Sequence, residues 1–205
     1  MLAWKKKILK VEIKKAIFEK SSPNIENCPK GNLFEIAFIG RSNVGKSSIL
    51  NMLLNKRSIA KVSKIPGKTK LINYFLINDS MYFVDLPGYG YAKLSKQNKF
   101  EISKITKSYF TDREQLKQIF LLIDIRHEIQ KSDYSFMVFL KSLNKDFIII
   151  FTKTDKIKDF LIEDLCKNYL QSIKNLYSKN IYFKSSSKSK NGKEEILNYI
   201  EKTIN

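Results

Sequence analysis

The segment from residue 40 to residue 47 constrains the fold more than any other part of this chain. It reads Gly-Arg-Ser-Asn-Val-Gly-Lys-Ser, a G-x-x-x-x-G-K-S pattern. A short apolar run at residues 33–39 precedes it, and apolar residues at helical spacing follow it at residues 48–54. The pattern therefore joins a strand to a helix. In that context such a loop cradles phosphate groups with its backbone N–H groups and the helix N-terminus.

The residues of this loop have distinct expected roles. We expect Lys46 to reach the β- and γ-phosphates of a nucleotide and to act in catalysis, and Ser47 to place its hydroxyl on Mg²⁺. The alternative, an ordinary glycine-rich turn, is disfavoured by the flanking strand and helix. The residues expected to contact the nucleotide are Gly40, Arg41, Ser42, Asn43, Val44, Gly45, Lys46, Ser47 and Ser48.

Composition indicates a folded cytoplasmic protein with a polyanionic partner. Hydrophobic residues make up 43% of 205, and the two cysteines have no disulfide or metal-site spacing, which suits a reducing cytosol. The longest apolar runs have the length of strands, so we expect no membrane contact. A net charge of +18 favours nucleic acid as a partner. An AT-rich genome would also enrich lysine, isoleucine and asparagine.

Alternating strand and helix patterns predict an α/β fold with a mostly parallel sheet covered by helices on both faces. Residues 78–80 form a tight turn, so the strands on either side of it read as an antiparallel hairpin. The expected strands are residues 33–39, 71–77, 81–85, 118–124, 147–152 and 181–183. The expected helices are residues 48–54, 97–111, 132–143, 160–176 and 193–202. We predict a six-stranded single domain over residues 33–205 and a basic extension over residues 1–32, where residues 8–18 suit either an added strand or a helix.

A second pattern, Asp-Leu-Pro-Gly, ends the third expected strand, at the edge of the sheet where ligands bind in such folds. An aspartate there holds Mg²⁺ through water, and the glycine lets its N–H approach a γ-phosphate, which makes Gly88 a candidate catalytic residue. The residues expected at the nucleotide are Asp85, Leu86, Pro87 and Gly88.

A third pattern, Thr-Lys-Thr-Asp, follows the fifth expected strand and points to guanine. The Asp155 carboxylate accepts from both N1–H and N2–H of guanine, whereas adenine offers no such pair of donors. Lys153 lays its aliphatic stem across the base. A serine run after the last strand offers backbone N–H groups to guanine O6. The residues expected around the base are Thr152, Lys153, Thr154, Asp155, Lys156, Ser185, Ser186 and Ser187.

The basic loop between the first helix and the second strand supplies one more candidate. Thr69 is expected to bind Mg²⁺, sense the γ-phosphate and take part in catalysis, so that release of this contact on hydrolysis loosens the loop. The expected nucleotide contacts of this loop are Pro66, Gly67, Lys68 and Thr69.

Together these patterns resemble the translation-factor-related (TRAFAC) P-loop GTPases, and among them the EngB (YihA/YsxC-type) ribosome-biogenesis GTP-binding proteins. The resemblance covers roughly residues 33–204. It rests on residues 40–48, 66–69 with 72–75, 85–92, 124–127 with Asp133, and 152–155. Ile129 stands where that family often has proline. The resemblance implies a three-layer Ras-like fold and Mg²⁺-dependent hydrolysis of GTP to GDP. It also implies a switch role in bacterial assembly of the large ribosomal subunit, with rRNA and ribosomal proteins as partners. We expect a monomer.

The residue after the D-x-x-G glycine is Tyr89, where many small GTPases carry a water-orienting glutamine. We therefore predict slow intrinsic hydrolysis, with Tyr89 directed away from the γ-phosphate. A ribosomal partner supplying groups in trans is one route to faster turnover. Asn43 offers another, since it matches an asparagine that helps hold K⁺ in related potassium-activated GTPases. The alternative is that Asn43 only favours the backbone shape of the loop.

Two further interpretations concern histidine and the aromatic residues. His127 is the only histidine, and we expect it to order its loop or contact RNA rather than act as a general base. Tyr74 and Phe75 are expected in the core, with Tyr89 and Tyr91 exposed. The competing functions are a non-catalytic RNA-binding module, an ATPase, which Asp155 disfavours, and a GTPase of tRNA modification or cell division.

Overall fold

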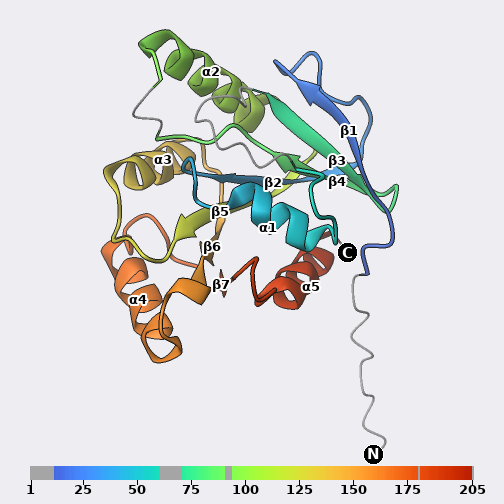
Figure 1. Ribbon diagram of the computed structural model, residues 1–205. Helices are drawn as coiled ribbons and strands as arrows, with labels where there is room; N and C mark the ends of the chain where they lie inside the picture. The colour runs from blue at the N-terminus through green and yellow to red at the C-terminus, as the bar shows by residue number, and fades with distance from the viewer. Residues whose placement is uncertain (1–11, 61–70, 91–93, 180, 205) are drawn as a thin grey trace, which may run out of the picture.

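The computed structural model describes residues 12–60, 71–90, 94–179 and 181–204. One sheet with strand order β1-β3-β4-β2-β5-β6-β7 forms the middle of the molecule (Figure 1). The strands are β1 (Ala16–Ser22), β2 (Phe34–Gly40), β3 (Ile72–Ile77), β4 (Met81–Asp85), β5 (Leu116–Asp124), β6 (Ile148–Thr152) and β7 (Tyr182–Lys184). Only β3 runs against its neighbours, β1 and β4. The other pairings are parallel, which confirms the predicted mostly parallel α/β sheet.

The sheet has one strand more than the six predicted, because β1 adds to its edge. β1 pairs antiparallel with β3, from Ala16 opposite Ile77 to Ser22 opposite Ile72. Only the two end residues of β1 are buried, so the strand lacks the alternation that marks a half-buried strand in a sequence. The division of the chain after residue 32 stays a prediction, and β1 shows that part of the expected extension belongs to the sheet.

Helices cover both faces of the sheet, which gives three layers. They are α1 (Lys46–Leu53), α2 (Lys96–Asp112), α3 (Lys131–Ser142), α4 (Asp159–Ser172) and α5 (Lys193–Ile204), with a short 3₁₀ turn η1 (Thr154–Lys156). One core lies under α1 and α5, which are side by side in Figure 1, and a second lies under α2, α3 and α4. Among the described helices, none has the length and apolar character needed to cross a bilayer.

The strands that position the site form for reasons that are visible in their sequences. β2 lies between β4 and β5 and is buried from Glu35 to Gly40, and from Ile36 onward it has no polar or charged side chain. The β3–β4 turn places Asn78 and Asp79 at positive φ, which asparagine and aspartate tolerate. Tyr74 and Phe75 of β3 are buried, as predicted.

A buried ion pair lies at the start of β2, at the opposite end of this strand from the phosphate loop. Arg113 forms it with Glu35, whose side chain is fully buried. Tyr109 Oη donates to Glu35 Oε2 over 2.7 Å, and Arg113 Nε donates to the same oxygen over 3.3 Å. The carboxylate is therefore compensated by a charge and by hydrogen bonds, as a buried ion requires.

Candidate functional site

The predicted phosphate loop joins the end of β2 to the start of α1. Gly45 precedes the helix with φ +100°, a conformation that strains a side chain, and Asn43 has φ 65°. The first turn of α1 carries no side-chain cap and no acidic residue. Within the described residues, no side chain accepts from the first N–H groups of this helix, and the positive end of the helix dipole faces the loop. This arrangement fits a bound phosphate chain.

The structure brings the loop lysine to the aspartate of the D-x-x-G pattern. Lys46 opens α1, Asp85 ends β4, and their side chains form a nearly buried ion pair. Asn73 Nδ2 lies 3.5 Å from the other carboxylate oxygen of Asp85. Ser47 follows Lys46 in the first turn of α1, so a hydroxyl and a carboxylate are offered on neighbouring elements. Hard oxygen donors of this kind suit Mg²⁺. Their role as metal ligands stays a prediction.

The loop that contains Gly88 is hydrogen-bonded to the phosphate loop. Tyr89 N donates to Gly40 O over 3.3 Å, and Ser42 N donates to Tyr89 O over 3.1 Å. Arg41 and Tyr89 consequently pair as an isolated parallel bridge beyond the ends of the strands. These contacts place Gly88 beside the phosphate loop.

The Tyr89 side chain is directed at α3. Tyr89 Oη donates to Asp133 Oδ1 over 3.0 Å, and its ring stacks on Phe136 with centroids 4.3 Å apart. The expectation that Tyr89 is exposed is wrong, because the ring is partly buried against α3. Burial, and next the Asp133 charge, raise the pKa of Tyr89 well above its ordinary value.

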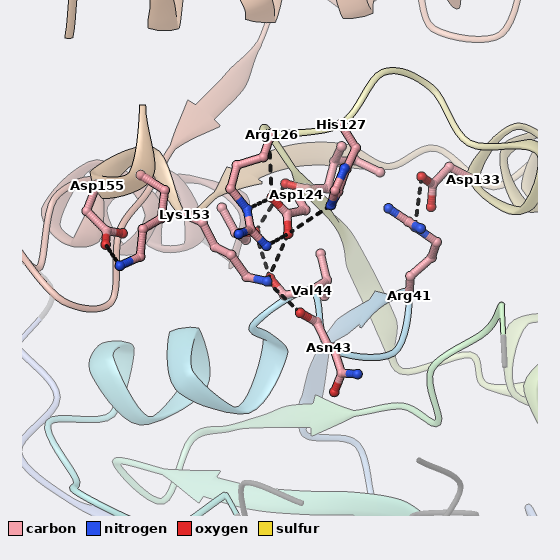
Figure 2. Close-up of polar contacts among 12 residues, drawn as sticks. Arg41, Asn43, Val44, Asp124, Arg126, His127, Asp133, Lys153 and Asp155 are labelled. Carbon is pink, nitrogen blue, oxygen red and sulfur yellow. Dashed lines mark hydrogen bonds and ion pairs between the residues drawn. The ribbon is translucent and has the colours of Figure 1, made fainter. Parts of the chain in front are cut away.

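The side chain of Arg41 is directed at the Asp133 carboxylate and does not run along the phosphate loop. Its Nε lies 3.1 Å from Asp133 Oδ2, as Figure 2 shows. Burial raises the pKa of Asp133 and outweighs the opposing effect of the Arg41 charge. The predicted contact between Arg41 and the nucleotide stays a prediction, and it now concerns the backbone of this residue.

The Thr-Lys-Thr-Asp pattern begins at the end of β6 and is tied to the phosphate loop. Thr152 Oγ1 donates to Val44 O over 2.7 Å. Lys153 Nζ donates to Asn43 O over 2.7 Å and lies 2.8 Å from Asp124 Oδ2 (Figure 2). The loop predicted to recognise the base and the loop predicted to bind phosphate therefore form one unit.

Asp155 and the serine run also meet. Ser186 Oγ donates to Asp155 Oδ1 over 2.7 Å, and this hydrogen bond is the main cause of the lowered pKa of Asp155. Thr154 N donates to Ser185 O over 3.3 Å, so the two loops are also joined through their backbones. Ser186 is buried and Ser187 is exposed. An ionised Asp155 presents only acceptors, as recognition of guanine N1–H and N2–H demands.

One part of the site had no role assigned from the sequence. Asp124 ends β5, and Arg126 donates to its carboxylate from Nε over 2.9 Å and from Nη2 over 2.8 Å. Burial by itself would raise the pKa of Asp124, but the hydrogen bonds from Arg126 and Lys153 hold it well below the usual range. His127 Nε2 lies 3.8 Å from the same carboxylate. An acidic residue at the carboxyl end of a buried strand was the available signal, the same one that identified Asp85.

Several predicted residues lie outside the described part of the chain. They are Pro66, Gly67, Lys68, Thr69 and Tyr91. The predicted Mg²⁺ and γ-phosphate role of Thr69 stays a prediction. Of the basic residues near this loop, Lys56 and Arg57 are described, and both are exposed.

Comparison with known proteins agrees with this geometry. A protein-family profile described as "50S ribosome-binding GTPase" matches residues 35–153. The "Probable GTP-binding protein EngB" of Porphyromonas gingivalis is 46% identical over 192 residues, covering 93% of this chain and 96% of that protein. The protein of the same description from Flavobacterium johnsoniae is 47% identical over 196 residues, with 93% and 92% covered.

Solved structures share the fold. The crystal structure of a probable GTP-binding protein engB matches with a TM-score of 0.66 and 24% identity, covering 83% of this chain and 98% of that one. Era, in complex with MgGDPNP and a segment of 16S ribosomal RNA, matches with a TM-score of 0.66 and 23% identity, covering 84% and 57%. Because curated relatives align over nearly its whole length, this chain belongs to the EngB family of GTP-binding proteins, which are P-loop GTPases.

Proposed function

We propose that this protein is a GTP/GDP switch that acts in assembly of the large ribosomal subunit of bacteria. In this proposal it binds GTP with Mg²⁺ and hydrolyses it slowly to GDP and phosphate. The nucleotide part of the proposal rests on three acidic residues and their partners at the carboxyl ends of the parallel strands. Asp85 is paired with Lys46, Asp124 is paired with Lys153, and Asp155 accepts a hydrogen bond from Ser186.

The proposed roles build on this arrangement and add Thr69, which lies outside the described residues. Lys46 and the N–H groups of the first turn of α1 bind the β- and γ-phosphates, and Asp155 binds the guanine edge. Ser47 and Thr69 provide hydroxyls for Mg²⁺, and Asp85 binds it through water. Mg²⁺ at such a site supplies neutralisation of the charge on the phosphate oxygens.

The two interpretations of Asn43 differ in whether a bound ion takes part in hydrolysis. Its positive φ supports the interpretation that asparagine is there for backbone shape, because asparagine adopts the left-handed region more readily than most residues. The second proposal is a K⁺ ion beside Asn43 that speeds hydrolysis. Turnover measured in KCl and in NaCl distinguishes them, since equal rates exclude the potassium effect.

The ribosomal part rests on charge and family. A net charge of +18 favours an RNA-rich particle, and the matching family is described by its binding to the 50S subunit. We place the protein in the bacterial cytoplasm as a monomer that contacts rRNA and ribosomal proteins.

Co-sedimentation with purified large subunits tests the proposal. It is run with GDP and with a non-hydrolysable GTP analogue, each at two salt concentrations. We expect binding that depends on the nucleotide and falls steeply with salt. Absence from the large subunit in both nucleotide states, with GTP still hydrolysed, would instead favour a GTPase of tRNA modification or cell division. Lack of multiple turnover even with subunits present would favour a non-catalytic RNA-binding module.

A further inference from the structure

One carboxylate of α3 joins the two loops expected to surround the γ-phosphate. Asp133 lies in the first turn of α3 and is 1% exposed. One of its oxygens accepts from Tyr89 Oη over 3.0 Å, and the other lies 3.1 Å from Arg41 Nε. Tyr89 directly follows the D-x-x-G glycine, and Arg41 is the second residue of the phosphate loop. Asp133 thus fixes one side chain from each loop against the same helix.

Gly90, the residue after Tyr89, also lies close to α3 and to Arg41. Gly90 has φ +73°, and a Cβ built there would lie 3.2 Å from Ser132 Oγ and 3.3 Å from Arg41 Cγ. Both distances are tighter than ordinary side-chain contacts, so little space separates this part of the loop from α3 and Arg41. The contact between the loop and α3 therefore extends over two consecutive residues.

The other side of the loop borders open space. A cavity of about 590 Å³ lies between α2 and α3, and residues 87–90 form part of its wall together with Ile102 and Phe139. No side chain in the described part of the chain fills this cavity beside residues 87–90. A loop without packed neighbours on one side relies on its remaining contacts for a fixed position. Among the described residues, those contacts include the hydrogen bond from Leu86 N to Phe38 O and the contacts that Tyr89 and Gly90 make with the phosphate loop and α3.

We propose that Asp133 is a positioning residue that places the backbone N–H of Gly88 for the γ-phosphate, acting through Tyr89 and Arg41. Gly88 precedes Tyr89 in the chain, so a displaced Tyr89 moves the Gly88 amide. GDP has no γ-phosphate and does not use this amide. The inference rests on the proposed function, because it requires GTP in the site, and it makes Asp133 a determinant of the preference for GTP over GDP.

Two substitutions and two matched controls test this role. Asp133→Asn removes the charge that pairs with Arg41, and Tyr89→Phe removes only the hydroxyl. The controls are Asp146→Asn, at an aspartate whose side chain is 83% exposed, and Tyr134→Phe, at an exposed tyrosine of α3. Affinities for GDP and for a non-hydrolysable GTP analogue are measured by fluorescence titration with labelled nucleotides in the presence of Mg²⁺.

Both test variants are expected to bind the GTP analogue about five- to tenfold more weakly, as loss of one positioning hydrogen bond predicts, with GDP affinity within about twofold of wild type. The controls keep both affinities. Equal losses for the two nucleotides, or no loss for either, would overturn the positioning role.

The experiment separates this role from folding and from the proposed function. Melting temperatures identify variants whose losses come from instability. If Asp133→Asn does not fold, Tyr89→Phe decides, because it leaves the Asp133–Arg41 pair in place. Wild-type protein that binds neither nucleotide would overturn the proposed function itself. If the wild type binds both nucleotides normally but Tyr89→Phe loses affinity for both equally, only the inference about Asp133 is overturned.

Discussion

Lys153 and Asn43, which are 110 positions apart in the sequence, are joined by a 2.7 Å hydrogen bond from Nζ to the backbone carbonyl oxygen. The same ammonium group lies 2.8 Å from Asp124 Oδ2. Lys153 therefore bridges the end of β5, the phosphate loop and the loop after β6. A side chain in this position stabilises the phosphate loop in one conformation as well as contacting a base.

Substitution of Lys153 by alanine should weaken the binding of both GTP and GDP. The variant loses a charge-assisted hydrogen bond to Asn43 and the stem expected to lie on the base, so we expect about a 10- to 100-fold loss for each nucleotide. Titration with labelled nucleotides measures it. Lys167→Ala, at an exposed lysine of α4, is the control. Unchanged affinities in Lys153→Ala would show that the bridge does not support the nucleotide site.

Asp155→Asn should change the preferred base. Asparagine offers an N–H where the carboxylate accepts, which suits the C2 carbonyl of xanthine and leaves the guanine donors without a second acceptor. We expect guanine nucleotides to bind about 100-fold more weakly or worse, with xanthine nucleotides gaining relative to them. Competition against labelled GDP measures both. A variant that kept its preference for guanine would contradict the assignment of Asp155.

The ionisation of Asp124 should make the free energy of unfolding depend on pH in the acid range. The hydrogen bonds from Arg126 and Lys153 hold its pKa below the ordinary value of 3.8. Its contribution is therefore complete above pH 3.8 and is lost as the pH falls toward the lower pKa of the folded state. We expect Asp124→Asn to lower the free energy of unfolding by about 1–3 kcal/mol at pH 7.

Urea unfolding at several pH values between 2 and 7 tests this linkage. The difference in stability between wild type and Asp124→Asn should shrink as the pH falls below 3.8, because the unfolded wild-type chain then binds a proton at Asp124 that the folded protein does not bind. A difference that stays constant with pH would rule out an ionic contribution from Asp124.

Arg113→Met should be among the most destabilising single changes in the described part of the chain. It leaves the Glu35 carboxylate fully buried without its cation, which costs about 3–5 kcal/mol. Adding Glu35→Gln should recover part of the loss, since no buried charge then remains. Unfolding in denaturant measures both. Because the pair lies at the opposite end of β2 from the phosphate loop, folded Arg113→Met should bind GDP normally.

Much of this fold is predictable because its inner strands are simple. Continuous apolar runs form the buried centres of these strands, at residues 36–39 of β2, 119–123 of β5 and 148–151 of β6, and residues 78–80 carry a turn composition. β1 is less predictable from the sequence, because it buries little between its two ends and its ladder with β3 is formed by backbone groups. Backbone pairing leaves no residue pattern to detect.

The candidate site also contains some residues that the sequence identifies and some contacts that it does not. Lys46, Asp85 and Asp155 were identifiable because chain spacing and strand ends set their positions. The partners of Arg41 and Tyr89 were not, since the sequence does not say which way a side chain leaves a loop, and Asp133 lies 44 residues beyond Tyr89. Contacts of this kind depend on how α3 packs on the sheet.

The β1–β3 pairing also affects how the chain assembles. β1 is translated before its partner β3, which is made only after the whole of β2, the phosphate loop and α1. β1 can therefore form its ladder only after the residues between Ser22 and Ile72 have been made. Once docked, β1 occupies the hydrogen-bonding edge of β3, which would otherwise be open to pairing with another polypeptide.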